Sequence, residues 1–226
     1  MAKAKWKNNR KTNHLLPINT KYYLFSEGIK TEPNYFGQFK KYIESNPVYK
    51  NLVYIHPCGS ETVRVLNEAR KFVEDNKITK GQIWCIYDKD SFPAADFNAV
   101  VEIADSLNRN SNDLIYRCAW SNECIEIWFI LHFAYYTSNN HRKDYSKYLN
   151  DKFNDISIGK YEKNSPDIFD ILLKYGNPAQ AIRFAKKLIE GHETEPPSNI
   201  APATKVYELV EELMVFLPEE IRLKFI

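Results

Sequence analysis

Apolar residues along the first 137 positions alternate between continuous runs and runs at helical spacing. The continuous runs predict four β-strands, at 21–25, 52–55, 83–87 and 114–119. Apolar side chains three and four positions apart predict the intervening helices, over 31–43, 63–73 and 97–103. A fourth helix is expected to begin with Ser121 as its cap and to run to about residue 136. Four strand–helix units in a row are typical of a parallel sheet with right-handed crossovers.

The rest of the chain has a different pattern. Residues 138–165 are polar and irregular, and helical spacing then returns in three segments, 167–175, 179–190 and 204–216. Pro196 and Pro197 indicate a loop over 191–202. We therefore expect an α/β protein with a central, mainly parallel four-stranded sheet flanked by helices over residues 20–137. A helical C-terminal extension, residues 138–226, is expected to pack on this core.

Composition and charge restrict the function only slightly. The chain has 226 residues, of which 44% are hydrophobic and 27% charged, and its net charge is +2. This composition is that of a folded globular protein, and the overall charge does not argue for nucleic acid. A basic N-terminal arm over residues 1–19 could contact phosphates or act as a solubilising tail. With no signal peptide and no apolar run of roughly 20 residues, we expect a cytoplasmic protein without membrane contact.

The cysteines suggest no disulfide framework or zinc site. None belongs to a Cys-x-x-Cys pair, and most lie in or beside apolar runs, so reduced thiols are expected at Cys58, Cys85, Cys118 and Cys124.

Three carboxylates stand where predicted strands end. Glu27 follows the first strand, and Asp88 and Asp90 follow the third. Ligands of parallel sheets bind beyond the carboxyl ends of the strands, so neighbouring strands would bring these groups together. If the backbone stays extended, Asp88 and Asp90 point to the same side. Oxygen ligands without His or Cys favour Mg²⁺ or Mn²⁺, although each acid could instead belong to a turn or a helix cap.

Several segments resemble the RloB family, a branch of the Toprim superfamily. Residues 24–36 (LFSEGIKTEPNYF) resemble its opening motif, and residues 85–90 (CIYDKD) resemble its Asp-x-Asp strand. Residues 121–133 resemble a third motif, in which the family usually has Ser-Asn-Pro before an aromatic residue and Glu; Glu123 and Ile125 depart from it here. A looser match lies at 199–204. The resemblance begins near residue 20 and implies a Toprim-like, Rossmannoid core.

The resemblance also implies roles for individual residues. Asp88 and Asp90 would hold the metal, and Glu27 would act as general base or acid or as a further ligand. Gly28, Lys30, Asn122, Lys160 and Lys163 would bind the substrate. Asn122 and Glu126 are expected to share one helix face. Glu126 would be catalytic by completing the acidic cluster or would position Lys30, or the two residues could form an ordinary capping and surface pair. Supporting positions would be Glu32, Ser121 and His132, where Glu32 could also be a first-turn helix acid and His132 is better explained as a packed histidine.

The activity implied is Mg²⁺- or Mn²⁺-dependent phosphodiester hydrolysis of DNA or RNA, perhaps tRNA. RloB-like proteins resemble effectors of bacterial anti-phage, abortive-infection systems, and their usual genetic neighbour is an RloA-like ABC-type ATPase. The alternatives are a Toprim scaffold that binds nucleic acid or regulates without cutting, and a primase-like polymerase. The sequence leaves open the choice of DNA or RNA and a homo-oligomeric state.

Overall fold

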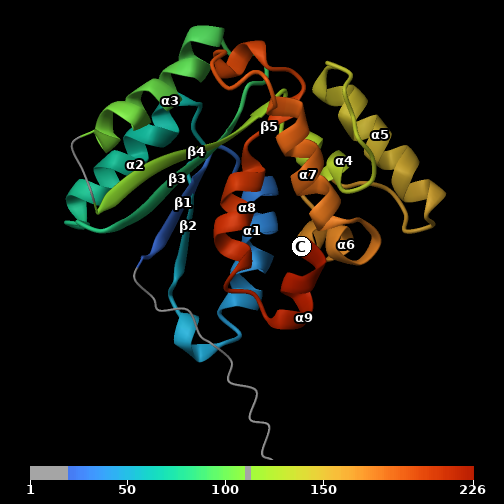
Figure 1. Ribbon diagram of the computed structural model, residues 1–226, viewed down its shortest axis with the longest axis horizontal. Helices are drawn as coiled ribbons and strands as arrows, with labels where there is room; N and C mark the ends of the chain where they lie inside the picture. Colours follow the sequence, from blue (N-terminus) through green and yellow to red (C-terminus); the bar gives the residue numbers. More distant parts are fainter. Residues whose placement is uncertain (1–19, 110–112) are drawn as a thin grey trace, which may run out of the picture.

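A five-stranded sheet forms the centre of the computed structural model, which describes residues 20–109 and 113–226 (Figure 1). The strand order is β2-β1-β3-β4-β5, in which β1 to β4 are parallel and β5 is antiparallel to β4. The strands are β1 (Tyr22–Ser26), β2 (Val53–Pro57), β3 (Gly81–Asp88), β4 (Leu114–Asn122) and β5 (Ala203–Thr204). The predicted α/β class, with a mostly parallel sheet and a helical C-terminal part, is confirmed. The basic segment expected over residues 1–19 lies outside the described residues.

Helices cover both faces of the sheet (Figure 1). One face is covered by α2 (Val63–Asp75) and α3 (Ala94–Asn108), and the other by α1 (Thr31–Ile43) and α8 (Val206–Met214). Beyond α1 and α8 lie the other α-helices, α4 (Glu126–Leu131), α5 (Arg142–Asp155), α6 (Ile168–Tyr175), α7 (Pro178–Ile189) and α9 (Glu219–Arg222). Short 3-10 helices occupy Pro47–Tyr49, Pro197–Asn199 and Leu223–Phe225.

The continuous apolar strands are explained by these two layers of helices. Successive side chains of a strand point to opposite faces, so a strand covered on both faces needs apolar residues throughout. Leu24 and Trp84 belong to the core shared with α1 and the C-terminal helices. Phe25 and Cys85 belong to the core under α2 and α3. The C-terminal extension and the sheet therefore share one hydrophobic cluster.

Two predicted elements differ from the observed ones. Ser121 does not cap a helix: it lies in β4, and its hydroxyl is 3.0 Å from that of Thr204 in β5. Because β5 pairs with the end of β4, this strand continues to residue 122, and α4 begins only at Glu126. The pairing strand has two residues, too few for a periodic pattern, so the sequence did not reveal it.

Residues 138–165 are also not entirely irregular. They contain the fourteen-residue helix α5, whose buried side chains Tyr145, Leu149 and Phe153 are spaced by four. Most of its other residues are charged or polar, so its apolar stripe gives only a weak helical pattern in the sequence. No helix in the described part of the chain is long and apolar enough to span a bilayer.

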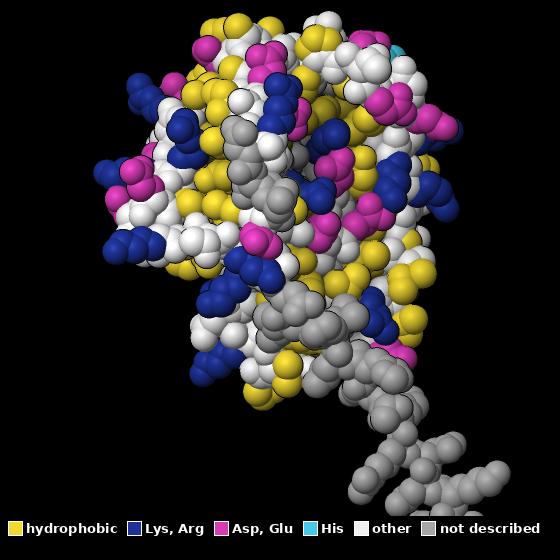
Figure 2. All heavy atoms as spheres, turned by 60° about the vertical axis from the view of Figure 1, so that its left-hand side comes forward, with side chains coloured by type: hydrophobic (Ala, Val, Ile, Leu, Met, Phe, Trp, Pro, Cys, Tyr) yellow, Lys and Arg dark blue, Asp and Glu magenta, His cyan; other side chains and the backbone are white. Residues whose placement is uncertain are grey.

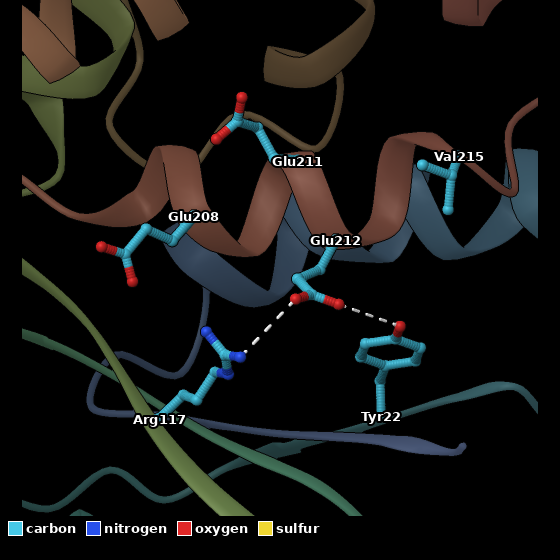
Figure 3. Close-up of a pocket in the computed structure, with 6 residues that line it drawn as sticks. All are labelled: Tyr22, Arg117, Glu208, Glu211, Glu212 and Val215. Atoms are coloured by element: carbon cyan, nitrogen blue, oxygen red, sulfur yellow. Dashed lines mark hydrogen bonds and ion pairs between the residues drawn. The ribbon is translucent and has the colours of Figure 1, made fainter. Parts of the chain in front are cut away.

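Helix α8 is fixed to the sheet by polar contacts at the amino end of β1 (Figure 3). The Tyr22 hydroxyl donates to Glu212 Oε2 (3.2 Å), and Arg117 Nη2 lies 3.8 Å from Glu212 Oε1. The hollow beside these residues is at the opposite end of β1 from Glu27 and holds no part of the predicted constellation. On the face shown in Figure 2, basic and acidic side chains are interspersed, in keeping with the small net charge.

Candidate functional site

The predicted carboxylates meet at a topological switch point of the sheet. From β1 the chain passes through α1 to β2 on one side, and then through α2 to β3 on the other side of β1. A crevice therefore opens beyond the carboxyl ends of β1 and β3, where ligands of such sheets bind. A pocket of about 370 Å³ lies there, lined by Glu27, Gly28, Ile29, Lys30, Thr31, Glu32, Asp88, Asp90, Lys163 and Asn164.

Glu27 and Asp88 are brought together by strand pairing. The Glu27 N–H donates to the Ile86 carbonyl (2.9 Å), which continues the β1–β3 ladder by one step. Glu27 Oε2 in turn accepts from the backbone N–H groups of Asp88 and Thr62, both at 3.4 Å. The acids that follow β1 and β3 therefore lie close together at one edge of the sheet. Asp88 itself is only 8% exposed.

Asp90 reaches the same pocket by a different backbone path from the one expected. The strand ends at Asp88, and Asp90 has a positive φ of 38°, so the two side chains do not follow strand alternation. The Asp90 N–H donates to the Glu123 carbonyl at 2.9 Å, which fixes the turn against the end of β4. Asp90 Oδ2 lies 2.6 Å from Arg142 Nη1, in α5.

Glu32 occupies the space beside Gly28. It lies in the first turn of α1, is 5% exposed, and its Oε2 atom has no hydrogen-bond partner. A Cβ built on Gly28 would lie 2.1 Å from that oxygen. Gly28 is therefore required by the Glu32 carboxylate, which fills the space beside the Gly28 backbone.

Glu126 adds a fifth acid next to the pocket, and this one is buried. It is the first residue of α4 and is 1% exposed. Its Oε1 atom accepts from the Tyr161 hydroxyl at 3.1 Å and lies 3.6 Å from Lys163 Nζ. Its Oε2 atom has no partner. Glu126 thus lies beside Lys163, which lines the pocket, and it does not share a helix with Asn122.

The segment that carries Lys163 is tied to the start of α1. The Thr31 hydroxyl donates to the Lys163 carbonyl at 3.1 Å, and the Asn34 amide donates to the Asn164 carbonyl at 2.9 Å. Thr31 is the first residue of α1, and Lys30 is the N-cap residue, which makes no capping hydrogen bond with its side chain. These bonds hold the Lys163 ammonium over the carboxylates.

The electrostatics of the pocket follow from burial of several acids together. Burial raises the pKa of Glu27 to about 7, against the lowering effect of its backbone donors. Burial also raises the pKa of Glu32 to about 7, and the Glu126 carboxylate adds to this while Lys163 opposes it. For Asp88, burial and then the carboxylates of Glu32 and Glu126 raise the pKa well above its ordinary value. Burial lowers the pKa of Lys163, but the carboxylates, Glu126 first, outweigh it.

The donor set fits a hard divalent cation. Within the described ranges of the chain, three buried carboxylate oxygens have no hydrogen-bond partner, namely Glu32 Oε2, Asp90 Oδ1 and Glu126 Oε2. Buried charged groups normally find a partner, and oxygen-only ligands suit Mg²⁺ or Mn²⁺. Among the described residues, however, no three carboxylates of this pocket have oxygens within 4.8 Å of one another. Side-chain movement is therefore needed before three of them could share one ion.

Besides Glu126, which lies next to the pocket, four predicted residues do not line it. The Asn122 amide donates to the carbonyls of Pro197, Ser198 and Ile200, and so fixes the segment before β5. Ser121 is used in the β4–β5 pair described above, and Lys160 is exposed and outside the lining.

The fourth, His132, is a packed histidine. It is 2% exposed, and its Nδ1 atom lies 2.9 Å from the Trp128 carbonyl. Burial lowers its pKa to about 4, so it is neutral at physiological pH. These contacts favour the interpretation of His132 as a packed structural histidine.

Two residues of the site were not found by sequence reasoning. Arg142 contacts Asp90, and Tyr161 contacts Glu126. Both come from the segment 138–165, which carries no motif. The four-residue spacing of apolar residues in α5 was the available signal for a helix there, but nothing local indicated that Arg142 faces an acid 52 positions earlier.

A comparison with known proteins identifies the family of the chain. A family model described as RloB-like protein matches residues 22–213, well over half of the 226-residue chain. No curated protein and no solved structure gives a significant match. The match spans β1 to α8 and therefore includes every carboxylate of the pocket. The chain belongs to the RloB-like protein family.

Proposed function

We propose that this protein is a divalent-metal-dependent nuclease that hydrolyses phosphodiester bonds of DNA or RNA, with tRNA as one candidate. The observation that carries the proposal is the group of five acids, Glu27, Glu32, Asp88, Asp90 and Glu126, gathered at the switch point with three unpartnered buried oxygens. Such charge concentration is costly unless a cation or protons compensate it. The resemblance of the segments around Glu27, Asp88 and Glu126 to Toprim motifs supports the same assignment.

The acids of the pocket divide into those that would hold the metal ion and those that would transfer protons. Asp88 and Asp90, at the end of β3, would hold Mg²⁺ or Mn²⁺, with Glu27 as a further ligand when it is deprotonated. A bound ion would stabilise charge on the transferring phosphoryl group and make its water more acidic. Glu27, with a pKa raised to about 7, is suited to accept a proton from water near neutral pH. Glu32 and Glu126 are assigned the tuning of the charge around Asp88.

Two lysines at the rim could bind the substrate backbone. Lys30 and Lys163 both line the pocket, and each has an exposed side chain that can meet a phosphate. Lys163 contacts Glu126 at 3.6 Å, so it would exchange a buried carboxylate for a phosphate oxygen when substrate binds. The proposal also includes an RloA-type ATPase as the partner and a role in anti-phage defence. Its substrate is DNA or RNA.

The test is metal-dependent cleavage by the full-length protein, alone and together with the ATPase. Single-stranded DNA, double-stranded DNA and tRNA are incubated with Mg²⁺ or Mn²⁺. We expect cleavage that is abolished by Asp88→Asn and by Glu27→Gln. Glu208→Gln, in the hollow at the other end of the sheet (Figure 3), is the control and should leave cleavage unchanged. Cleavage that survives both changes in the acidic pocket would refute the assigned centre.

Metal binding separates the nuclease from the non-cutting alternative. Titration with Mn²⁺, followed by its paramagnetic resonance signal, should show binding that Asp88→Asn weakens by at least about 10-fold, or ~1.4 kcal/mol. A protein that binds nucleic acid but takes up no ion at this pocket would instead be a Toprim-like scaffold without hydrolytic function.

A further inference from the structure

A second group of potential metal ligands lies at the end of β2, on the edge of the sheet next to β1. His56 belongs to β2, Cys58 follows it, and Glu68 comes from α2. One ligand atom from each lies within 4.8 Å of the other two, and the His56 Nε2–Glu68 Oε2 distance is 3.7 Å. It is the one group of three or more His, Cys, Asp or Glu side chains in the described part of the chain with this spacing.

The chemistry of this group differs from that of the acidic pocket. A thiolate, an imidazole and a carboxylate are the ligands of zinc, whereas Mg²⁺ favours oxygen alone. With zinc–ligand bonds of about 2.0–2.3 Å, tetrahedral ligands lie roughly 3.3–3.8 Å apart. The observed separations therefore need only a small closure. Three protein ligands leave a fourth position for water.

The surrounding contacts orient the side chains of His56 and Glu68. The His56 ring packs against Phe25 (centroids 5.4 Å apart) and near Phe72 (6.3 Å), which restricts its rotation. The Ser60 hydroxyl donates to Glu68 Oε1 at 2.7 Å and leaves Oε2 directed to His56. Outer contacts of this kind orient metal ligands in proteins. The side chains of His56 and Glu68 are each 40% exposed, so an ion can enter from solvent.

We propose that His56, Cys58 and Glu68 form a second metal site, which binds one zinc-type transition-metal ion at the carboxyl end of β2. Binding forms a metal–sulfur bond and breaks the Cys58 S–H bond, with the proton released to the buffer. The site is separate from the acidic pocket, and its existence does not depend on the proposed nuclease activity.

The proposed ion would brace the segment that supports Glu27. The Cys58 N–H donates to the Ser26 carbonyl at 2.8 Å, and four residues later the Thr62 N–H donates to Glu27 Oε2 at 3.4 Å. The segment between them is therefore anchored to the end of β1 at both ends. Joining Cys58 to Glu68 through a metal would restrict this segment further and hold the Thr62 donor in place.

Cobalt titration tests this site directly. The full-length protein is stripped with a chelator and titrated with Co²⁺, whose bonds to thiolate absorb in the near ultraviolet. We expect one thiolate–cobalt band that saturates at one equivalent, is bleached by Zn²⁺ and persists in excess Mg²⁺. Cys58→Ser should abolish the band, and His56→Asn or Glu68→Gln should weaken cobalt binding by at least about 10-fold.

Matched variants decide the outcome independently of cleavage. Cys118→Ser removes a different, half-buried free thiol and should leave the band unchanged, as should Asp88→Asn in the acidic pocket. Circular dichroism confirms folding, and His56→Asn replaces Cys58→Ser if the latter does not fold. Absence of a thiolate band in the unaltered protein, or its persistence in Cys58→Ser, would overturn the proposal. Loss of cleavage in Asp88→Asn with the band intact would support both centres separately.

Discussion

Replacement of Gly28 by alanine tests how the acidic pocket is packed. The added methyl group would lie 2.1 Å from Glu32 Oε2 and 3.0 Å from its carboxyl carbon, so the carboxylate must move by more than 1 Å to restore a normal contact of ~3.4 Å. Glu32 is only 5% exposed, which leaves little room for that movement. We expect Gly28→Ala to lower the free energy of unfolding by about 1–3 kcal/mol, the usual cost of overpacking a filled site.

A double-mutant cycle in urea denaturation isolates this contact. In a Glu32→Ala background the obstacle is gone, so Gly28→Ala should change stability by no more than ~0.5 kcal/mol. The coupling energy between Gly28→Ala and Glu32→Ala is then roughly equal to the whole destabilisation caused by Gly28→Ala alone. Gly37→Ala in the middle of α1 is the matched control, because a Cβ there meets nothing within 4 Å. It should stabilise the protein by up to ~1 kcal/mol through helix propensity.

The result that would refute this reasoning is a cost of Gly28→Ala that is the same with and without the Glu32 side chain. In that case the backbone of residue 28, and not the neighbouring carboxylate, would account for the glycine. The same variants carry information about function, since a displaced Glu32 carboxylate enters the pocket that we assign to metal and phosphate.

Three further predictions concern charge and hydrogen bonding in the pocket. In the metal-free protein, Glu32 has a folded-state pKa of about 7 against an ordinary value of 4.5, so between these pH values the folded state binds more protons than the unfolded state. The free energy of unfolding therefore falls as pH rises from about 4.5 to about 7. Glu32→Gln should flatten this slope, measured by urea denaturation in the presence of a chelator. Arg142→Gln removes the cation 2.6 Å from Asp90 and should tighten Mn²⁺ binding by about 5-fold, or ~1 kcal/mol. Tyr161→Phe removes a donor from the buried Glu126 carboxylate and should destabilise the protein by about 1–3 kcal/mol, measured by thermal and urea unfolding.

Each of these predictions has an outcome that contradicts it. The Glu32 prediction is contradicted if the free energy of unfolding rises between about pH 5 and pH 7, with the same slope in the unaltered protein and in Glu32→Gln. That result would show that Glu32 does not take up a proton on folding. Weaker Mn²⁺ binding in Arg142→Gln would mean that the arginine orders Asp90 for the ion. Tyr42→Phe, which removes a more exposed hydrogen bond to Asp170 (2.8 Å), is the control for Tyr161→Phe and should cost less.

Prediction from sequence succeeded where a local pattern and a general rule acted together. Buried parallel strands must be apolar on both faces, so β1 and β3 were visible as continuous runs, and the acids that follow them could be assigned to one edge. Where the pattern was short or mixed it failed: β5 has two residues, and α5 is mostly polar. Asp90 lines the pocket with Glu27 and Asp88, although its backbone turns where strand alternation predicts an extended chain.

The sequence by itself determined the α/β class, the order of the strand–helix units and the position of Glu27, Asp88 and Asp90 at strand ends. These properties depend on side-chain periodicity and on residues that are neighbours in the chain. Only the tertiary structure decided which groups surround them: Arg142 and Tyr161 reach the acids from a segment without a motif, and His56, Cys58 and Glu68 converge from a strand, a turn and a helix. Such contacts depend on how distant elements pack, and packing is fixed by the whole core, not by any one segment.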